Sequence, residues 1–192
     1  TVLAIYLYPA QTIWSTTKLT SLEDIKGKKL RVTSPEQGDF VRELGGVPVT
    51  ISAPDVPSAL QSGVVEGVLT ASTGGGVIWK DQLKYNYRFP VNYFHSIIIV
   101  SSDAFERLSE EDQAAVRTVA EESVKAINEE QFSSDIAMTE SFAADGMVIT
   151  EATAEDIDAA RAAYVAKWDE WSARQTPEIQ QALANVRKVL GR

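Results

Sequence analysis

The sequence predicts an α/β protein in which short strands and short helices alternate and one very long helix follows them. Over the first hundred residues, runs rich in β-branched and aromatic residues alternate with short helical patterns bounded by Gly or Pro. This order is typical of largely parallel sheets covered by helices. Residues 109–145 contain neither Pro nor Gly, so one uninterrupted helix is expected over that whole stretch.

Six strands are expected, and two of them are apolar enough to predict burial. The first begins at Val2 and stops at Pro9, and it reads as a buried strand. Another has the fully aliphatic centre Ile97–Val100, which is typical of a strand buried on both faces. The expected strands cover residues 2–8, 29–33, 47–51, 64–69, 92–101 and 147–150.

The expected helices are short in the first half of the chain and longer in the second. Ser109 with Asp112 makes a capping-box-like start for the long helix, and Gly146 ends it. At 1.5 Å per residue that helix is roughly 55 Å long, and its irregular apolar spacing favours a spine across two lobes over a coiled coil. The other expected helices cover residues 21–27 (with Ser21 as cap), 37–44, 55–61, 77–83, 153–175 and 178–190.

Composition excludes several kinds of chemistry. The 192 residues include no Cys and a single His, His95, and they carry a net charge of −9. Disulfides, iron–sulfur clusters, thiolate zinc and multi-histidine metal sites are therefore excluded, and no cofactor is expected. The acidic balance argues against nucleic-acid binding. No phosphate loop, GxSxG or HExxH motif is present, so we expect no catalytic residues and no enzyme. No apolar stretch approaches the roughly 18–20 residues that span a bilayer.

Arg31 is the charged residue that most needs an explanation. It lies between Leu30 and Val32 inside an otherwise apolar strand. A buried charge requires an anionic partner, because leaving it unpaired is costly. That partner could be a carboxylate of the protein, or a ligand carboxylate that a guanidinium binds with two parallel hydrogen bonds.

Other candidate residues each have two interpretations. The glycines at 74–76 could offer backbone N–H groups to an anion or form a flexible turn. His95 could face a pocket or lie hydrogen-bonded at a strand edge. The aromatic residues in or beside expected loops could line a ligand pocket or belong to the core: Trp14, Trp79, Tyr85, Tyr87, Tyr93 and Phe94.

Five segments, in order along the chain, resemble one family. Residues 22–32 (LEDIKGKKLRV) are similar to its "sLeDlkGlKiRv" segment, and residues 55–67 (DVPSALQSGVVEG) to its "sEvytALqtGvvDG" segment. Residues 44–49 resemble a third segment, and residues 101–105 with 108–113 together resemble a fourth, which leads into that family's very long helix. The chain therefore resembles the solute-binding proteins of tripartite ATP-independent periplasmic (TRAP) transporters, the DctP-like family.

The resemblance implies a two-lobe periplasmic-binding-protein (Venus-flytrap) fold with a long lobe-spanning helix. It implies that the lobes close on a small organic acid and that the loaded protein, a periplasmic monomer when full length, docks on the TRAP permease. By this comparison the chain looks like the C-terminal two-thirds of a member, with the first lobe incomplete and no signal peptide in the chain. The expected boundaries are 1–8 in the first lobe or crossover, 9–91 in the second lobe, 92–136 returning to the first lobe, and 137–192 for the end of the long helix and the C-terminal helices on the second lobe.

The resemblance also implies a ligand site. Arg31 occupies the position of the arginine that pairs with the substrate carboxylate, and Thr70 stands where many members have a ligand-contacting Asn. Gln11 lies near the position where sialic-acid-binding members carry a second Arg. One cation beside a neutral amide suits a monocarboxylate, and an aromatic or apolar tail would fit the remaining expected lining residues, Trp14, Trp79, Asn92, Tyr93 and Phe94.

Two alternatives to a transport protein remain open at this stage. A ligand-sensing accessory protein for a membrane receptor would use the same kind of site. An enzyme acting on organic acids would have to work through His95 and an acidic neighbour.

Overall fold

The structure is a computed structural model that describes residues 1–191. The chain divides into two units, Thr1–Ala152 and Thr153–Arg192, and each is described by itself. The expected α/β class is confirmed for the first unit, which combines one six-stranded sheet with helices. The lobe boundaries expected at residues 8, 91 and 136 stay predictions.

The sheet is mixed rather than largely parallel, with the strand order β3-β2-β4-β1-β5-β6. β2 runs parallel to β3 and β4, and β5 runs parallel to β6. β1 pairs antiparallel with both β4 and β5, so the sheet changes direction on either side of it. The strands are β1 (Val2–Ser15), β2 (Lys29–Val32), β3 (Val47–Thr50), β4 (Gly67–Thr70), β5 (Tyr85–Ile99) and β6 (Val148–Glu151).

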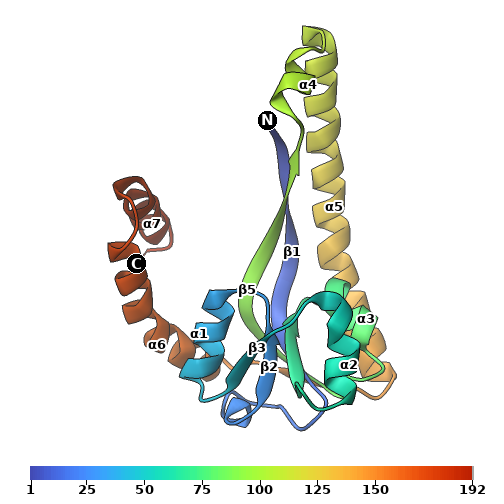
Figure 1. The fold of residues 1–192 in the computed structure, drawn as a ribbon, viewed down its shortest axis with the longest axis vertical. Coiled ribbons are helices and arrows are strands. Elements are labelled where there is room, and N and C mark those ends of the chain that lie inside the picture. Colours follow the sequence, from blue (N-terminus) through green and yellow to red (C-terminus); the bar gives the residue numbers. More distant parts are fainter. Residues whose placement is uncertain (192) are drawn as a thin grey trace. The chain divides into compact units, whose positions relative to one another are not determined.

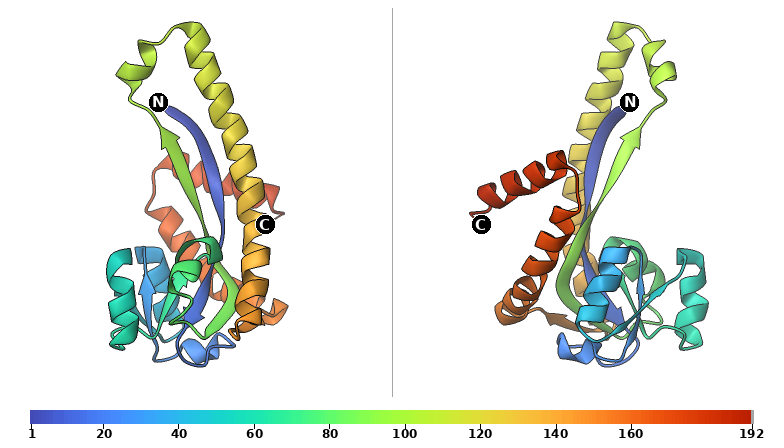
Figure 2. Two further views of the ribbon diagram at one scale, coloured as in Figure 1. Left: turned by 90° about the vertical axis from the view of Figure 1, so that its right-hand side faces the viewer. Right: turned by 60° about the vertical axis from the view of Figure 1, so that its left-hand side comes forward.

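β1 and β5 extend beyond the other strands as a long two-stranded ribbon beside the long helix α5, Glu110–Ala144 (Figures 1 and 2). The expected stop at Pro9 is wrong, because β1 continues through Pro9 and its register against β5 shifts between Leu7 and Ala10. A bulge of this kind tolerates a residue without an N–H.

The burial predicted for the ends of this ribbon is also wrong. Apolar side chains of both strands are exposed, because no further layer of the first unit covers them there. The exposed apolar residues on the ribbon are Val2, Ile5, Leu7, Tyr93, Phe94, Ile97 and Ile99.

Short helices connect the strands of the first unit, and the long helix α5 precedes its last strand, β6. α5 (Glu110–Ala144) has 35 residues and is therefore roughly 52 Å long, close to the expected length. The Ser109 side chain caps it by accepting the Asp112 N–H and donating to the Asp112 carboxylate over 2.7 Å, as predicted. The other helices are α1 (Pro35–Glu43), α2 (Val56–Gln61), α3 (Val77–Trp79) and α4 (Ser102–Glu106), with one-turn segments at Glu23–Ile25, Ala53–Asp55 and Ser72–Gly76.

Ser21 was predicted to cap the turn Glu23–Ile25, and this prediction is wrong. Leu22 precedes the turn and makes no side-chain cap. Instead, the backbone N–H and the hydroxyl of Thr20 both donate to the Asp24 carboxylate. An aspartate one turn away thus organises this corner in place of a serine cap.

Apolar layers cover both faces of the sheet. On one face, Trp14 packs edge-on against Phe142 of α5, with ring centres 5.6 Å apart, in a cluster that also contains residues of α2 and α3. On the other face, Phe40 of α1 stacks on Phe89 of β5. Because side chains alternate along a strand, Arg31, Val68 and Trp14, which are in register, belong to the first face.

The second unit consists of α6 (Ala154–Ala173) and α7 (Pro177–Val189), which confirms the two expected C-terminal helices. Thr153 and Asp156 form a reciprocal capping box at the start of α6. Arg187 of α7 pairs with Asp169 of α6 at 2.7 Å. Within residues 1–191, the structure contains no helix that has both the length and the apolar character needed to cross a membrane.

Candidate functional site

The candidate site lies at the carboxyl ends of β2 and β4. Arg31 is the next-to-last residue of β2, and Thr70 is the last residue of β4. The two strands are parallel neighbours, so both of these ends lie at the same edge of the sheet. Ligands of open α/β sheets bind at this edge.

Arg31 is buried without a carboxylate of the protein. Its side chain is 8% exposed, its Nε donates to the Ile51 carbonyl over 3.1 Å, and its guanidinium carbon lies 5.6 Å from the centre of the Trp79 ring. No carboxylate within residues 1–191 pairs with it, and no described residue accepts from its two terminal nitrogens. Burial of the guanidinium lowers the pKa of Arg31. The sequence left two partners open for Arg31, a carboxylate of the protein or one of a ligand. The described residues do not supply the first.

The glycine-rich turn after β4 is a packing element. The Gly75 N–H donates to the Thr70 hydroxyl, and the N–H groups of Gly74 and Gly76 both donate to the Ala71 carbonyl. Because these three N–H groups are already used, the turn does not offer them to an anion. A Cβ on Gly75 would fall on the Trp79 ring, and one on Gly76 would meet the Trp14 ring. The glycines therefore let two tryptophans approach the backbone.

The same turn is fastened to α5 by a polar network. The Ser72 hydroxyl donates to the Asp135 carboxylate, and the Thr73 hydroxyl donates to Gln131 over 2.7 Å. Asp135 also pairs with Arg88 of β5 at 2.7 Å, and both side chains are largely buried. The turn that carries Gly75 is thus fixed to the long helix and to β5 together.

Trp14 packs in the core and bonds to the end of β4. Its side chain is 0% exposed, and its ring N–H donates to the Thr70 carbonyl over 3.0 Å. The structure therefore places this residue in the core, under the end of β4, rather than on a surface open to solvent. Trp79 is also largely buried but contacts the Arg31 guanidinium.

Gln11 and Asn92 are brought together, on paired positions of β1 and β5. A third amide, Gln37 of α1, donates to both of them, over 2.5 Å to Gln11 Oε1 and 2.9 Å to Asn92 Oδ1. The sequence analysis did not select Gln37. The signal was available, since Ser34 and Gln37 have the spacing of a capping box, and the Ser34 side chain does cap α1.

The remaining predicted residues lie on the ribbon. Tyr93 and Phe94 follow Asn92 along β5 and are 62% and 37% exposed. His95 is exposed as well, and its side chain makes no hydrogen bond to another residue of the described part of the chain. Both rings are exposed, but as consecutive residues of a strand they point to opposite faces of β5.

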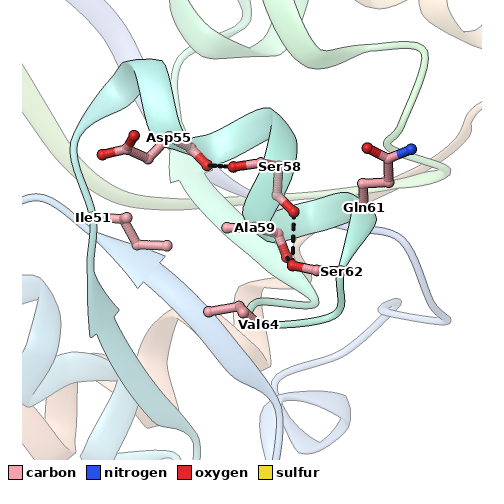
Figure 3. A pocket seen from close by; sticks show the side chains of 7 residues that line it. All are labelled: Ile51, Asp55, Ser58, Ala59, Gln61, Ser62 and Val64. Atoms are coloured by element: carbon pink, nitrogen blue, oxygen red, sulfur yellow. Dashed lines mark hydrogen bonds between the residues drawn. The ribbon is translucent and has the colours of Figure 1, made fainter.

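A depression of about 620 Å³ lies between the end of β3 and α2 (Figure 3). The hydroxyls of Ser58 and Ser62 in its wall donate to backbone carbonyls of Asp55 and Ser58, so their hydrogens are already used and only their oxygens could accept from a ligand. The depression contains none of the predicted site residues, and the one residue that it shares with the surroundings of Arg31 is Ile51. In residues 1–191 no group of three His, Asp or Glu side chains could hold a metal ion.

Known proteins match this chain over most of its length. Residues 1–175 match the family described as bacterial extracellular solute-binding protein, family 7 (DctP). The ectoine-binding periplasmic protein TeaA of Halomonas elongata is 27% identical over 153 residues, which is 73% of this chain and 42% of TeaA.

Solved structures agree with the fold. DctP7 of Bordetella pertussis, a solute receptor binding pyroglutamic acid, is 25% identical and superposes with a TM-score of 0.85 over 97% of this chain. A TRAP solute-binding protein from Xanthobacter autotrophicus with bound galacturonate is 22% identical, with a TM-score of 0.81 over the same share, and this likeness shows the fold. The chain spans 62% of each of these two solved chains. It belongs to the DctP family of TRAP-transporter solute-binding proteins.

Proposed function

We propose that the protein captures an organic carboxylate outside the cytoplasm and delivers it to a TRAP permease, with Arg31 as the anchor for the carboxylate. The observation that carries this proposal is the burial of Arg31 without a protein carboxylate. A guanidinium in that state gains most from a ligand that brings its own negative charge, because a charged pair in a largely buried position is screened less than one on the surface.

The contacts around Arg31 leave its terminal nitrogens for the ligand. Nε is occupied by the Ile51 carbonyl and one face by the Trp79 ring. The two remaining nitrogens present parallel N–H groups, which match the two oxygens of a carboxylate. We infer that the carboxylate lies in the plane of the guanidinium, at the carboxyl end of β2.

The rest of the ligand would lie toward β1 and β5. Gln11 and Asn92 supply neutral polar groups, Thr70 a hydroxyl, and Tyr93 and Phe94 exposed aromatic surface. With one cation and no second one among these residues, the set favours a monocarboxylate with a ring or apolar tail over a dicarboxylate. Pyroglutamic acid, which DctP7 binds, is a monocarboxylic acid with a ring, and it is the first ligand to try.

Calorimetric titration with a panel of acids tests the proposal. The panel contains pyroglutamate, mandelate, malate and succinate, and the variants are Arg31→Ala and Arg31→Lys. We expect a monocarboxylate to bind, Arg31→Ala to abolish binding, and Arg31→Lys to weaken it about tenfold or more because the bidentate geometry is lost. Arg42→Ala, on the exposed face of α1, is the control. Micromolar binding retained by Arg31→Ala would contradict the anchor, and binding of dicarboxylates alone would contradict the ligand class.

A further inference from the structure

We propose that Gln37 is a positioning residue that fixes the side-chain amides of Gln11 and Asn92 so that both present N–H donors to the ligand. It follows that the site selects acids with a second oxygen acceptor, such as a ring carbonyl or hydroxyl. This inference rests on the proposed function, since it concerns the same ligand.

The orientation of the Gln37 amide is set by the backbone. Gln37 is 3% exposed, and its Oε1 accepts the Thr33 N–H over 2.8 Å and the Thr33 hydroxyl over 2.9 Å. A backbone N–H can only donate, so the atom that faces it must be the amide oxygen. The amide nitrogen of Gln37 therefore points toward β1 and β5.

That nitrogen in turn sets the orientation of two further amides. It donates one hydrogen to Gln11 Oε1 over 2.5 Å and the other to Asn92 Oδ1 over 2.9 Å. An amide nitrogen cannot accept, so both neighbours must turn their oxygens toward it. All four hydrogen-bonding positions of Gln37 are then used, and a buried group with every position satisfied has no competing rotamer.

The consequence is a pair of outward-facing donors. Gln11 and Asn92 are half-buried cross-strand neighbours, and their NH₂ groups point away from Gln37. No acceptor for either NH₂ group is recorded within the described part of the chain. This place therefore offers only donors, which favours ligand oxygens and disfavours an ammonium or another N–H donor.

The residue that holds Gln37 follows the strand end that carries the anchor. Thr33, which holds Gln37, follows Arg31 by two residues, or roughly 7 Å of extended chain. The selection requires one small acid to reach from Arg31 to Gln11 and Asn92, with its carboxylate on the guanidinium and a second oxygen at the two amides. Pyroglutamate has such an oxygen in its ring, whereas cyclopentanecarboxylate has the same ring size and carboxylate without it.

Matched acids and near-isosteric variants test the selection. In the unmodified protein, pyroglutamate should bind about fivefold to tenfold more tightly than cyclopentanecarboxylate, the worth of one neutral hydrogen bond. Gln37→Glu keeps the bonds from Thr33 but accepts from its neighbours, so their oxygens turn outward and the preference should fall to about one. Gln37→Met keeps the length of the side chain without its hydrogen bonds, and it should also reduce the preference for pyroglutamate. Gln61→Glu makes the same change at an exposed position of α2 and should leave this preference unchanged.

A measurement without ligand separates this inference from the proposed function. By NMR, the side-chain NH₂ protons of Gln37 should exchange slowly with water, and those of Gln11 and Asn92 quickly. In Gln37→Glu, position 37 has no NH₂ group, and the NH₂ protons of Gln11 and Asn92 should become slow because they now donate to the carboxylate. Fast exchange at Gln37, or an unchanged acid preference in Gln37→Glu, would overturn the positioning role alone. If no acid binds while Gln37 is protected, the proposed function fails and the selection with it. Near-ultraviolet circular dichroism verifies that each variant is folded.

Discussion

The guanidinium carbon of Arg31 lies 5.6 Å from the centre of the Trp79 ring, so this nearly buried cation rests on an aromatic face and not on a carboxylate. A cation–π contact of this kind contributes about 1–2 kcal/mol. The loss of hydration on burying a charge costs several times more. In the ligand-free protein, Arg31 thus has an aromatic partner but no anionic one among the described residues, and an incoming carboxylate would supply it.

Arg31→Met is expected to stabilise the ligand-free protein while abolishing acid binding. Replacing an unpaired buried charge by an apolar side chain of similar length should raise the free energy of unfolding by about 1–3 kcal/mol. Urea denaturation measures this, with Arg42→Met on the surface of α1 as the control, expected to change it by less than about 0.5 kcal/mol. A loss of stability in Arg31→Met would show that the cation is already compensated.

Gly75→Ala is expected to weaken ligand binding through Trp79. The added Cβ would fall on the Trp79 ring and lie 2.7 Å from the Thr70 hydroxyl oxygen, so the ring must move. Such overpacking typically costs about 1–3 kcal/mol of stability. Displacing the ring also removes the surface on which Arg31 rests, so the Kd for the acid should rise as well.

Gly38→Ala is the matched control for that variant. Its Cβ would meet only the flexible end of the Arg42 side chain, at 3.3 Å. Because alanine favours a helix over glycine, the melting temperature should stay the same or rise. Thermal denaturation and calorimetric titration of both variants check the pair, and an unchanged Kd in Gly75→Ala would mean that Trp79 does not support the anchor.

The local signals in the sequence were sufficient for most elements and for the central residue of the site. The Ser109 cap, the long helix and the strand that carries Arg31 are where the pattern places them. These features depend on neighbours in the chain, such as a capping side chain or the absence of Pro and Gly. Arg31 was identifiable because a charge in an apolar strand must be compensated by something.

Features that depend on distant pairing were not predictable in the same way. β1 pairs with β4 more than fifty residues later, and its hydrophobic pattern says nothing about strand direction, so the sheet was expected to be mostly parallel. Trp14 was expected to line the site, but Gly76 lets its ring sit in the core. Gln37 was missed because its role arises only when α1, β1 and β5 meet.

Removing the cation between β5 and α5 is expected to destabilise the fold. Arg88 pairs with Asp135 at 2.7 Å and donates to Thr139 over 2.8 Å, in a largely buried position. Arg88→Met would leave the Asp135 carboxylate with the Ser72 hydroxyl alone, which should cost about 2–4 kcal/mol. Arg88→Met with Asp135→Leu removes both charges and should recover part of the loss. Urea denaturation measures both variants, and equal stabilities would contradict a coupled pair.

Asp24 is expected to make the stability of the first unit depend on pH. The Thr20 backbone N–H, at 2.8 Å, is the main cause of a lowered pKa for this carboxyl, with the Thr20 hydroxyl and Lys18 acting in the same direction against partial burial. The ordinary aspartate pKa is about 3.9, and the folded value lies below it. The stabilisation is therefore fully present above about pH 4 and is lost as the pH falls through the folded value.

Asp24→Asn keeps an acceptor for Thr20 but removes the charge. It should lower the free energy of unfolding by about 1 kcal/mol near neutral pH, the difference between a charged and a neutral hydrogen bond. Urea denaturation between pH 7 and pH 3 should show this difference shrinking below about pH 4, where the native carboxylate takes up its proton. Asp39→Asn, on the exposed side of α1, removes one negative charge elsewhere and gives the background to subtract. A difference that is constant over the whole range would mean that the Thr20 bonds stabilise the neutral and charged carboxyl equally.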